Sequence, residues 1–121
     1  METTPLDKDL KLSQKTTKIY EMQFKKDGIP VDITDWIVFF TLKENMNDTD
    51  DNAKIKKTII THEDATNGKS LIQLSSTDTD LTPKSYYYDI KVKDNCSPAN
   101  IVVIVRGRIT VEKIVTRRES A

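Results

Sequence analysis

The sequence has 121 residues, of which 36% are hydrophobic, which is enough for a single domain with one core. Nineteen Lys and Arg side chains balance nineteen Asp and Glu side chains, so the chain lacks the basic surplus with which proteins usually bind nucleic acids. Its apolar runs fall short of the roughly 20 residues that a membrane-spanning helix needs, so we expect neither nucleic acid nor membrane as a partner.

The N-terminal segment is polar and non-periodic. We interpret residues 1–15 as an extended arm, because its apolar residues Leu6, Leu10 and Leu12 are too sparse for a confident element. Its composition is also too polar for a secretory signal. Cys96 has no second cysteine to pair with, which favours synthesis in a reducing compartment.

The first predicted strand covers residues 17–25. Its apolar residues alternate with polar ones, which is the period of a half-buried strand, and Tyr20, Met22 and Phe24 share one side. Asp27 and Gly28 then form a turn dipeptide. Residues 36–44 are the most hydrophobic stretch, which predicts a strand that is covered on both faces at its start.

Three further segments continue the chain. Residues 45–52 are acidic and predict a loop, and residues 53–62 predict a strand with one solvated face. Asn67 and Gly68 give the strongest short turn signal, and residues 70–75 form a short strand. Cap-type residues and a proline in residues 76–83 indicate a corner.

Three consecutive tyrosines lie in the next predicted strand, residues 84–94. Alternation places Tyr86 and Tyr88 inward, with ring hydroxyls near the edge of the core, and Tyr87 outward. The last strand starts at residue 101, and Gly107 in its middle indicates a bulge or a close backbone approach. Its expected inward row is Ile101, Val103, Val105, Ile109 and Val111.

Six or seven strands separated by turn signals predict an all-β fold, an antiparallel β-sandwich, which the family resemblance described below makes immunoglobulin-like. The expected domains are the extended arm over residues 1–15, the sandwich over residues 16–118 and a C-terminal tail over residues 119–121. Trp36 starts the most apolar strand, and we assign it to the core.

Residues suited to catalysis or metal binding are few. His62 is the only histidine and we expect it at the surface, while Cys96 lies in a polar turn without a base in its sequence context. The acidic segment 45–52 could offer oxygen ligands to calcium, yet it lacks the glycine and glutamate of an EF-hand loop. We therefore expect no enzyme, no catalytic or metal-binding residue and no cofactor.

Several motifs in order resemble a known family. They are "DGIPVDIT" before a hydrophobic strand, "NGK" before a short strand, "DT" at a corner, "YYYDIKV", and "GRITVEKIVTR" at the end. This order resembles the immunoglobulin-like N-terminal domain of phage baseplate upper proteins and related phage tail and virion proteins. The match covers residues 16–118, and it departs from the family where Lys84 and Ser85 replace a glycine that commonly precedes the tyrosine strand.

The resemblance implies a non-enzymatic structural protein of the virion, made in the host cytoplasm. It would serve as a tail, baseplate or neck connector that docks to other virion proteins and repeats as a symmetric homo-oligomer. The candidate interaction residues are Leu6, Leu10, Leu12, Tyr87, Arg117 and Arg118. We expect the three leucines to become buried only in the assembly.

Three alternatives remain open. The first is a capsid decoration protein with the same domain. The second is a carbohydrate- or receptor-binding module, in which Trp36 and Tyr87 would be ring platforms and the acidic loop a calcium site. The third is a small inhibitor or adhesin subunit of a bacterium.

Overall fold

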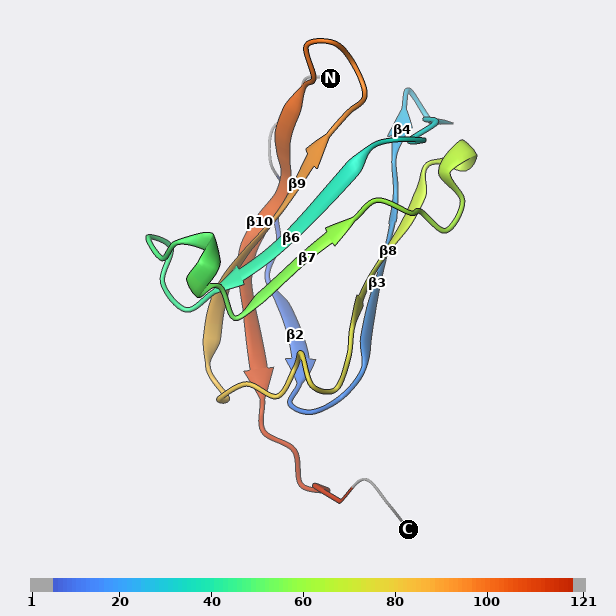
Figure 1. The fold of residues 1–121 in the computed structure, drawn as a ribbon. Helices are drawn as coiled ribbons and strands as arrows, with labels where there is room; N and C mark the ends of the chain where they lie inside the picture. Colours follow the sequence, from blue (N-terminus) through green and yellow to red (C-terminus); the bar gives the residue numbers. More distant parts are fainter. Residues whose placement is uncertain (1–5, 119–121) are drawn as a thin grey trace.

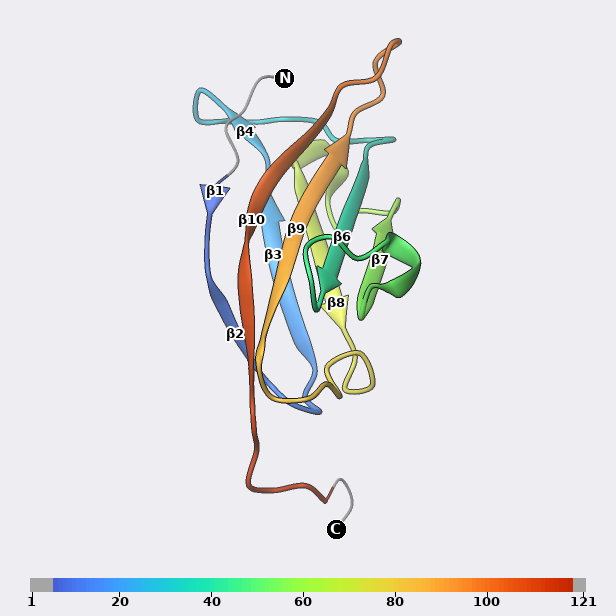
Figure 2. The same ribbon diagram turned by 90° about the vertical axis from the view of Figure 1, so that its left-hand side faces the viewer.

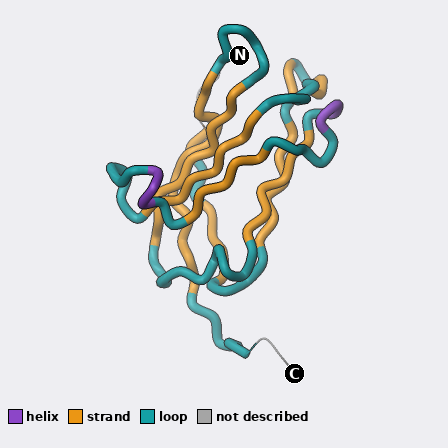
Figure 3. Tube along the Cα trace, viewed as in Figure 1, coloured by secondary structure: helices purple, strands orange, loops and turns teal. Residues whose placement is uncertain are grey.

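The computed structural model describes residues 6–118, and its strands form two packed sheets (Figure 1). The large sheet has the strand order β1-β10-β9-β6-β7, with β2 also paired to β10. The small sheet contains two strands, β3 and β8, and β4 pairs with β5 in a separate hairpin. Figure 3 shows that strands and loops make up the described chain apart from two short helical turns. The predicted all-β sandwich is confirmed.

Within the described residues, seven strands have four residues or more. They are β2 (Leu10–Ser13), β3 (Lys18–Gln23), β6 (Ile37–Lys43), β7 (Ile55–Ile59), β8 (Lys69–Leu74), β9 (Ser85–Lys93) and β10 (Ile101–Glu112). Three shorter strands are β1 (Leu6–Asp7), β4 (Lys25–Lys26) and β5 (Ile29–Pro30), and the two 3-10 turns are η1 (Asp50–Asn52) and η2 (Ala65–Asn67).

The sheet order is that of a variable-type immunoglobulin domain. Strands β10, β9, β6 and β7 take the places of G, F, C and C′, and β3 and β8 take those of B and E. Tyr86, at the start of β9, donates its hydroxyl proton to the carbonyl oxygen of Thr82 at 2.7 Å. A tyrosine at this corner that bonds to the backbone a few residues upstream is a hallmark of the fold.

The core lies between the two sheets, and its side chains come from the rows that period-two alternation predicts. Phe40 and Leu42 of β6 and Ile72 and Leu74 of β8 belong to one core cluster, and all four are fully buried. Trp36 is 9% exposed and packs edge-on against Phe24, with ring centroids 5.7 Å apart. The assignment of Trp36, Tyr86 and Tyr88 to the core is confirmed.

The expected N-terminal arm is wrong for its described part. Leu10–Ser13 pairs in parallel with residues 109–112 of β10, and Leu6–Asp7 pairs in parallel with Val105 and Arg106 (Figure 2). The prediction of a purely antiparallel sandwich is therefore also wrong at this edge, where β1 and β2 run parallel to β10. Leu12 is 3% exposed and Leu10 packs against the core, so Leu12 needs no assembly to become buried.

Backbone hydrogen bonds also hold this segment to the sheet. The Lys8 amide donates to the Arg106 carbonyl at 2.9 Å, and the Gln14 amide donates to the Glu112 carbonyl at 2.8 Å. Because polar residues suffice for such pairing, hydrophobic periodicity could not reveal it. Residues 1–5 of the arm and the tail 119–121 lie outside the described residues.

A bulge in β10 changes the predicted inward row. Val103 pairs with Lys91, but Val105 pairs with Ile90, so Ile104 is one extra residue in β10. Such an insertion shifts the alternation by one residue. Ile109 and Val111 are buried and Val105 packs on the core as expected, whereas Ile101 is 53% exposed and Val103 turns to the solvent side.

Gly107 marks a close backbone approach, as the sequence predicted, and not the bulge. A Cβ atom at this position would collide with the carbonyl oxygen of Lys8 in the segment between β1 and β2. The glycine therefore allows the N-terminal strands to lie against β10. The predicted turn at Asp27 and Gly28 is also confirmed, since both residues have positive φ angles, 52° and 80°, between β4 and β5.

Candidate binding face on the large sheet

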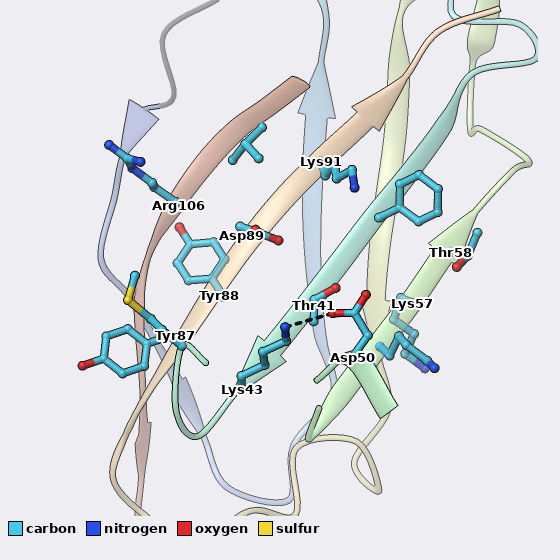
Figure 4. A pocket seen from close by; sticks show the side chains of 14 residues that line it. Thr41, Lys43, Asp50, Lys57, Thr58, Tyr87, Tyr88, Asp89, Lys91 and Arg106 are labelled. Carbon is cyan, nitrogen blue, oxygen red and sulfur yellow. Dashed lines mark ion pairs between the residues drawn. The ribbon is translucent and has the colours of Figure 1, made fainter. Parts of the chain in front are cut away.

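The solvent side of β10, β9, β6 and β7 carries a depression of about 730 Å³ (Figure 4). We call this side the outer face. Its lining residues come from all four strands, the loop after β6 and η1: Phe39, Thr41, Lys43, Met46, Asp50, Lys56, Lys57, Thr58, Tyr87, Tyr88, Asp89, Lys91, Val103 and Arg106.

Strand register arranges the outer face in three rows across the sheet. The first row contains Val103, Lys91, Phe39 and Thr58, the second contains Arg106, Asp89, Thr41 and Lys56, and the third contains Arg108, Tyr87 and Lys43. The Cβ atoms of directly opposite residues in such rows lie about 5 Å apart, so their side chains interact. The rows bring five cationic side chains together with one carboxylate.

The single carboxylate of the rows, Asp89, is half-buried at the centre of the face (Figure 4). Burial raises the pKa of Asp89, and the nearby cations Lys43 and Lys91 oppose that shift. Loss of hydration disfavours the charged form, and the two lysines favour it. The charged form of Asp89 is therefore destabilised by its partial loss of hydration, and the two lysines offset part of that cost.

Two cations of the outer face lie over aromatic rings. The Lys91 ammonium is 5.9 Å from the centroid of the Phe39 ring, and the Arg108 guanidinium is 5.2 Å from that of Tyr87. Among residues 6–118, neither cation has a carboxylate within ion-pair distance. Both cations thus lack a direct ion pair to the described chain, although Lys91 remains close to Asp89.

The other cations in these rows are paired. Lys43 binds Asp50 of η1 at 2.9 Å, and this hydrogen bond lowers the pKa of Asp50. Arg106 binds Asp7 at 3.0 Å, and Lys56 lies 3.8 Å from Asp51 of η1. The acidic segment 45–52 is therefore partly ordered by lysines of the sheet. Within the described residues, no three His, Cys, Asp or Glu side chains gather as a metal site would require.

The predicted site residues are not brought together. Tyr87 is half-buried in the depression, whereas Leu10 and Leu12 lie on the opposite edge strand beside the core. Arg117 and Arg118 are exposed in the segment that leaves the sandwich after β10 (Figure 1). The sequence did not predict that Asp89, Lys91 and Phe39 are neighbours, although the alternation of β9 puts Tyr87, Asp89 and Lys91 on one face of that strand.

His62 is not the surface residue that the sequence predicted. Its ring is half-buried, with Nε2 2.8 Å from the Trp36 carbonyl oxygen and Nδ1 2.8 Å from Ser70 Oγ. Since a carbonyl only accepts, Nε2 donates to Trp36, and the neutral ring accepts the Ser70 hydroxyl proton at Nδ1. Ser70 is fully buried, so this serine–histidine contact joins β8 to the start of β6 inside the fold.

The loop between β9 and β10 is organised by another carboxylate. Asp94 accepts hydrogen bonds from the amides of Cys96 and Asn100 and from the side-chain amide of Asn100. These bonds, above all those from Asn100, lower the pKa of Asp94 to about 2. Cys96 is exposed in this loop.

No helix in the described part of the chain is long and apolar enough to cross a membrane. Neither protein-family models nor curated proteins match the sequence. Among solved structures, the N-terminal domain of phage TP901-1 ORF48 superposes with a TM-score of 0.56 and 15% identity, covering 92% of each chain. A structure from a study of the cell-adhesive interactions of VGSC beta subunits gives a TM-score of 0.42 and 11% identity over 94% of this chain and 98% of the other.

The first of these likenesses extends over nearly the whole chain, and at 15% identity it concerns the fold. The fold that the sequence motifs implied is confirmed: the chain is a β-sandwich similar to the N-terminal domain of phage TP901-1 ORF48.

Proposed function

We propose that this protein is a non-enzymatic structural protein of a bacteriophage particle, in which the sandwich connects tail, baseplate or neck components. The observation that carries the proposal is the likeness to a phage domain over 92% of both chains, together with the ordered motifs that resemble phage baseplate upper proteins. Its partners would be other virion proteins and copies of itself in a symmetric ring. It would be made in the host cytoplasm and located in the virion.

The chemistry of the described residues supports a binding role more than a catalytic one. The serine–histidine pair that a hydrolase would use is buried, because Ser70 has no exposed surface and the second nitrogen of His62 is bound to a backbone carbonyl. A nucleophile must be reachable by substrate. The outer face instead offers charges, rings and a shallow depression, which suit a protein contact.

The carbohydrate-binding alternative loses one of its two ring platforms. Trp36 is buried between the sheets, and only Tyr87 of the expected pair reaches the outer face. The Tyr87 ring is moreover accompanied by the Arg108 guanidinium. We therefore propose the connector role. Capsid decoration is the alternative role, and the copy number in particles distinguishes the two.

Quantitative mass spectrometry of purified phage particles tests the proposal. A tail, baseplate or neck connector would be present in roughly six or twelve copies, since such components close into rings. On the order of hundreds of copies would identify a capsid decoration protein instead. Absence of the protein from particles that contain all other structural proteins would contradict a virion role.

A further inference from the structure

The outer face has a local excess of positive charge, although the whole chain is neutral. Its rows of cross-strand neighbours contain Lys91, Arg106, Lys56, Arg108 and Lys43 but only one carboxylate, Asp89. Ion pairs with η1 and β1 occupy part of this charge, whereas Lys91 and Arg108 have no carboxylate partner among residues 6–118. Three of the five cations thus have an ion pair within the described chain and two do not, although Lys91 also lies near enough to Asp89 and Asp50 to act on their pKa values.

Apolar side chains lie beside these cations. Phe39 and Val103 flank Lys91 on the two neighbouring strands, and Met46, which is 69% exposed, lines the same depression. Val103 reaches this side only because of the bulge in β10. A ligand for this surface must thus present both negative charge and apolar groups, which is the chemistry of an acidic protein segment.

A nucleic acid fits the face less well. The neutral chain has no long-range attraction for a polyanion, and both rings that could stack on bases already have cations placed over them. A protein segment that carries acidic and apolar residues on the same side would place carboxylates on the cations and apolar groups on Phe39 and Val103.

We propose that the outer face binds an acidic, partly apolar segment of a neighbouring protein along its depression, with carboxylates on Lys91 in the depression and on Arg108 beside Tyr87 at its edge. The proposal rests on the connector function above and identifies the surface and the partner chemistry for it. Each bound carboxylate would pair with a cation that lies over an aromatic ring, namely Lys91 over Phe39 or Arg108 over Tyr87.

Titration of the isolated full chain with a synthetic peptide tests this proposal, with amide chemical shifts from nuclear magnetic resonance as the readout. The probe is a capped peptide of about twelve residues in which two Asp and two Leu residues repeat, so that each side of the extended chain carries both kinds, and its length spans the four strands. We expect shifts at Lys91, Tyr87 and Phe39. A peptide with Lys in place of Asp, and a thymidine oligonucleotide, should leave these amides unshifted.

Charge reversal gives the matched comparison. Lys91→Glu should weaken binding of the Asp peptide by about tenfold or more. Lys18→Glu should leave binding unchanged, because Lys18 lies in the same way over a ring, that of Tyr20 at 5.4 Å, but on the small sheet. Unchanged thermal unfolding of both variants would establish that they fold.

Three results would overturn the proposal: no shifts with the Asp peptide at roughly millimolar concentration, equal binding of the Lys peptide, or an equal loss for both lysine variants. Stronger binding of the oligonucleotide at the same residues would also overturn it in favour of nucleic acid. Because the titration uses the isolated chain, its failure leaves the copy number in particles, and hence the proposed function, as a separate question.

Discussion

The hydroxyl of Tyr86 and the carbonyl oxygen of Thr82 are 2.7 Å apart, and their hydrogen bond closes the corner between the small and large sheets. Two residues later on the same face, Tyr88 donates its hydroxyl proton to the Lys8 carbonyl oxygen at 2.6 Å. One tyrosine strand thus fixes both a sheet-to-sheet corner and the N-terminal edge. A third core tyrosine, Tyr20, has a buried hydroxyl without a hydrogen-bond partner among the described residues.

These tyrosines predict opposite responses to loss of the hydroxyl. Tyr86→Phe and Tyr88→Phe should each lower the free energy of unfolding by about 1 kcal/mol, because each removes a hydrogen bond and leaves a carbonyl with one partner fewer. Tyr20→Phe should be neutral or stabilising, since it removes a buried polar atom that is unsatisfied. Urea unfolding of the three variants measures this order. A larger loss for Tyr20→Phe than for Tyr86→Phe would contradict it.

His62 should be important for stability in spite of its position in a loop. His62→Leu leaves the buried Ser70 hydroxyl and the Trp36 carbonyl without the imidazole, so we expect a loss of about 2–4 kcal/mol. Thr61→Ala, at an exposed neighbouring position, serves as the control and should change stability by less than about 0.5 kcal/mol. If His62→Leu unfolds at the same urea concentration as the wild type, the bridge through His62 is not a stabilising one.

Two glycine substitutions should act through different physical causes. Gly107→Ala brings a Cβ onto the Lys8 carbonyl and should displace β1 and the start of β2 from β10. Gly28→Ala meets open space but has a φ angle of 80°, so its cost should be only about 1 kcal/mol. Amide hydrogen exchange separates the two cases: faster exchange of Lys8 and of the residues of β2 is expected for Gly107→Ala alone.

The lowered pKa of Asp94 predicts how the stability of the protein depends on pH in the acidic range. Its pKa is lowered to about 2 in the folded protein, so its contribution to stability is fully present above the unfolded value of about 3.9 and is lost as pH falls through the folded value. Asp94→Asn cannot titrate. The wild type and the variant should therefore differ in stability most at neutral pH and converge between about pH 4 and pH 2. A difference that is the same at pH 2 and pH 7 would be inconsistent with this assignment.

The raised pKa of Asp89 predicts the opposite dependence of stability on pH. Burial raises its pKa in the folded protein, so ionisation costs stability as pH rises above the unfolded value. Asp89→Asn should thus be more stable than the wild type at pH 7 and lose this advantage below about pH 4. Thermal unfolding at both pH values measures the effect, which solvent screening keeps small at a half-exposed site. A less stable variant at pH 7 would mean that the surrounding lysines outweigh burial.

Several strands could be predicted from the chain because one face of each is buried. In β3, β8 and β9 a period of two follows directly from the alternation of side chains across a sheet, and turn signals such as Asp27-Gly28 reflect local backbone preferences. These are properties of consecutive residues, so they can be read without knowledge of the partner strand. The same alternation placed Tyr86 and Tyr88 in the core and Tyr87 outside it.

The outer face could not be predicted in this way, because it depends on which strands become neighbours. Phe39 and Val103 are far apart in the chain and meet at Lys91 only through the order β10-β9-β6, and the bulge at Ile104 decides that Val103 faces outward. The N-terminal strands escaped prediction for a related reason, since backbone hydrogen bonds to β10 leave little hydrophobic pattern.

The amino-acid sequence by itself determined the all-β class, the turns and the inward tyrosines, because local periodicity and backbone preference act within each strand. Only the tertiary structure decided the contacts of His62 with Trp36 and Ser70, the approach of Lys8 to Gly107 and the rows of charges on the outer face. Each of these depends on contacts between residues distant in the chain, which cooperative packing of the two sheets selects.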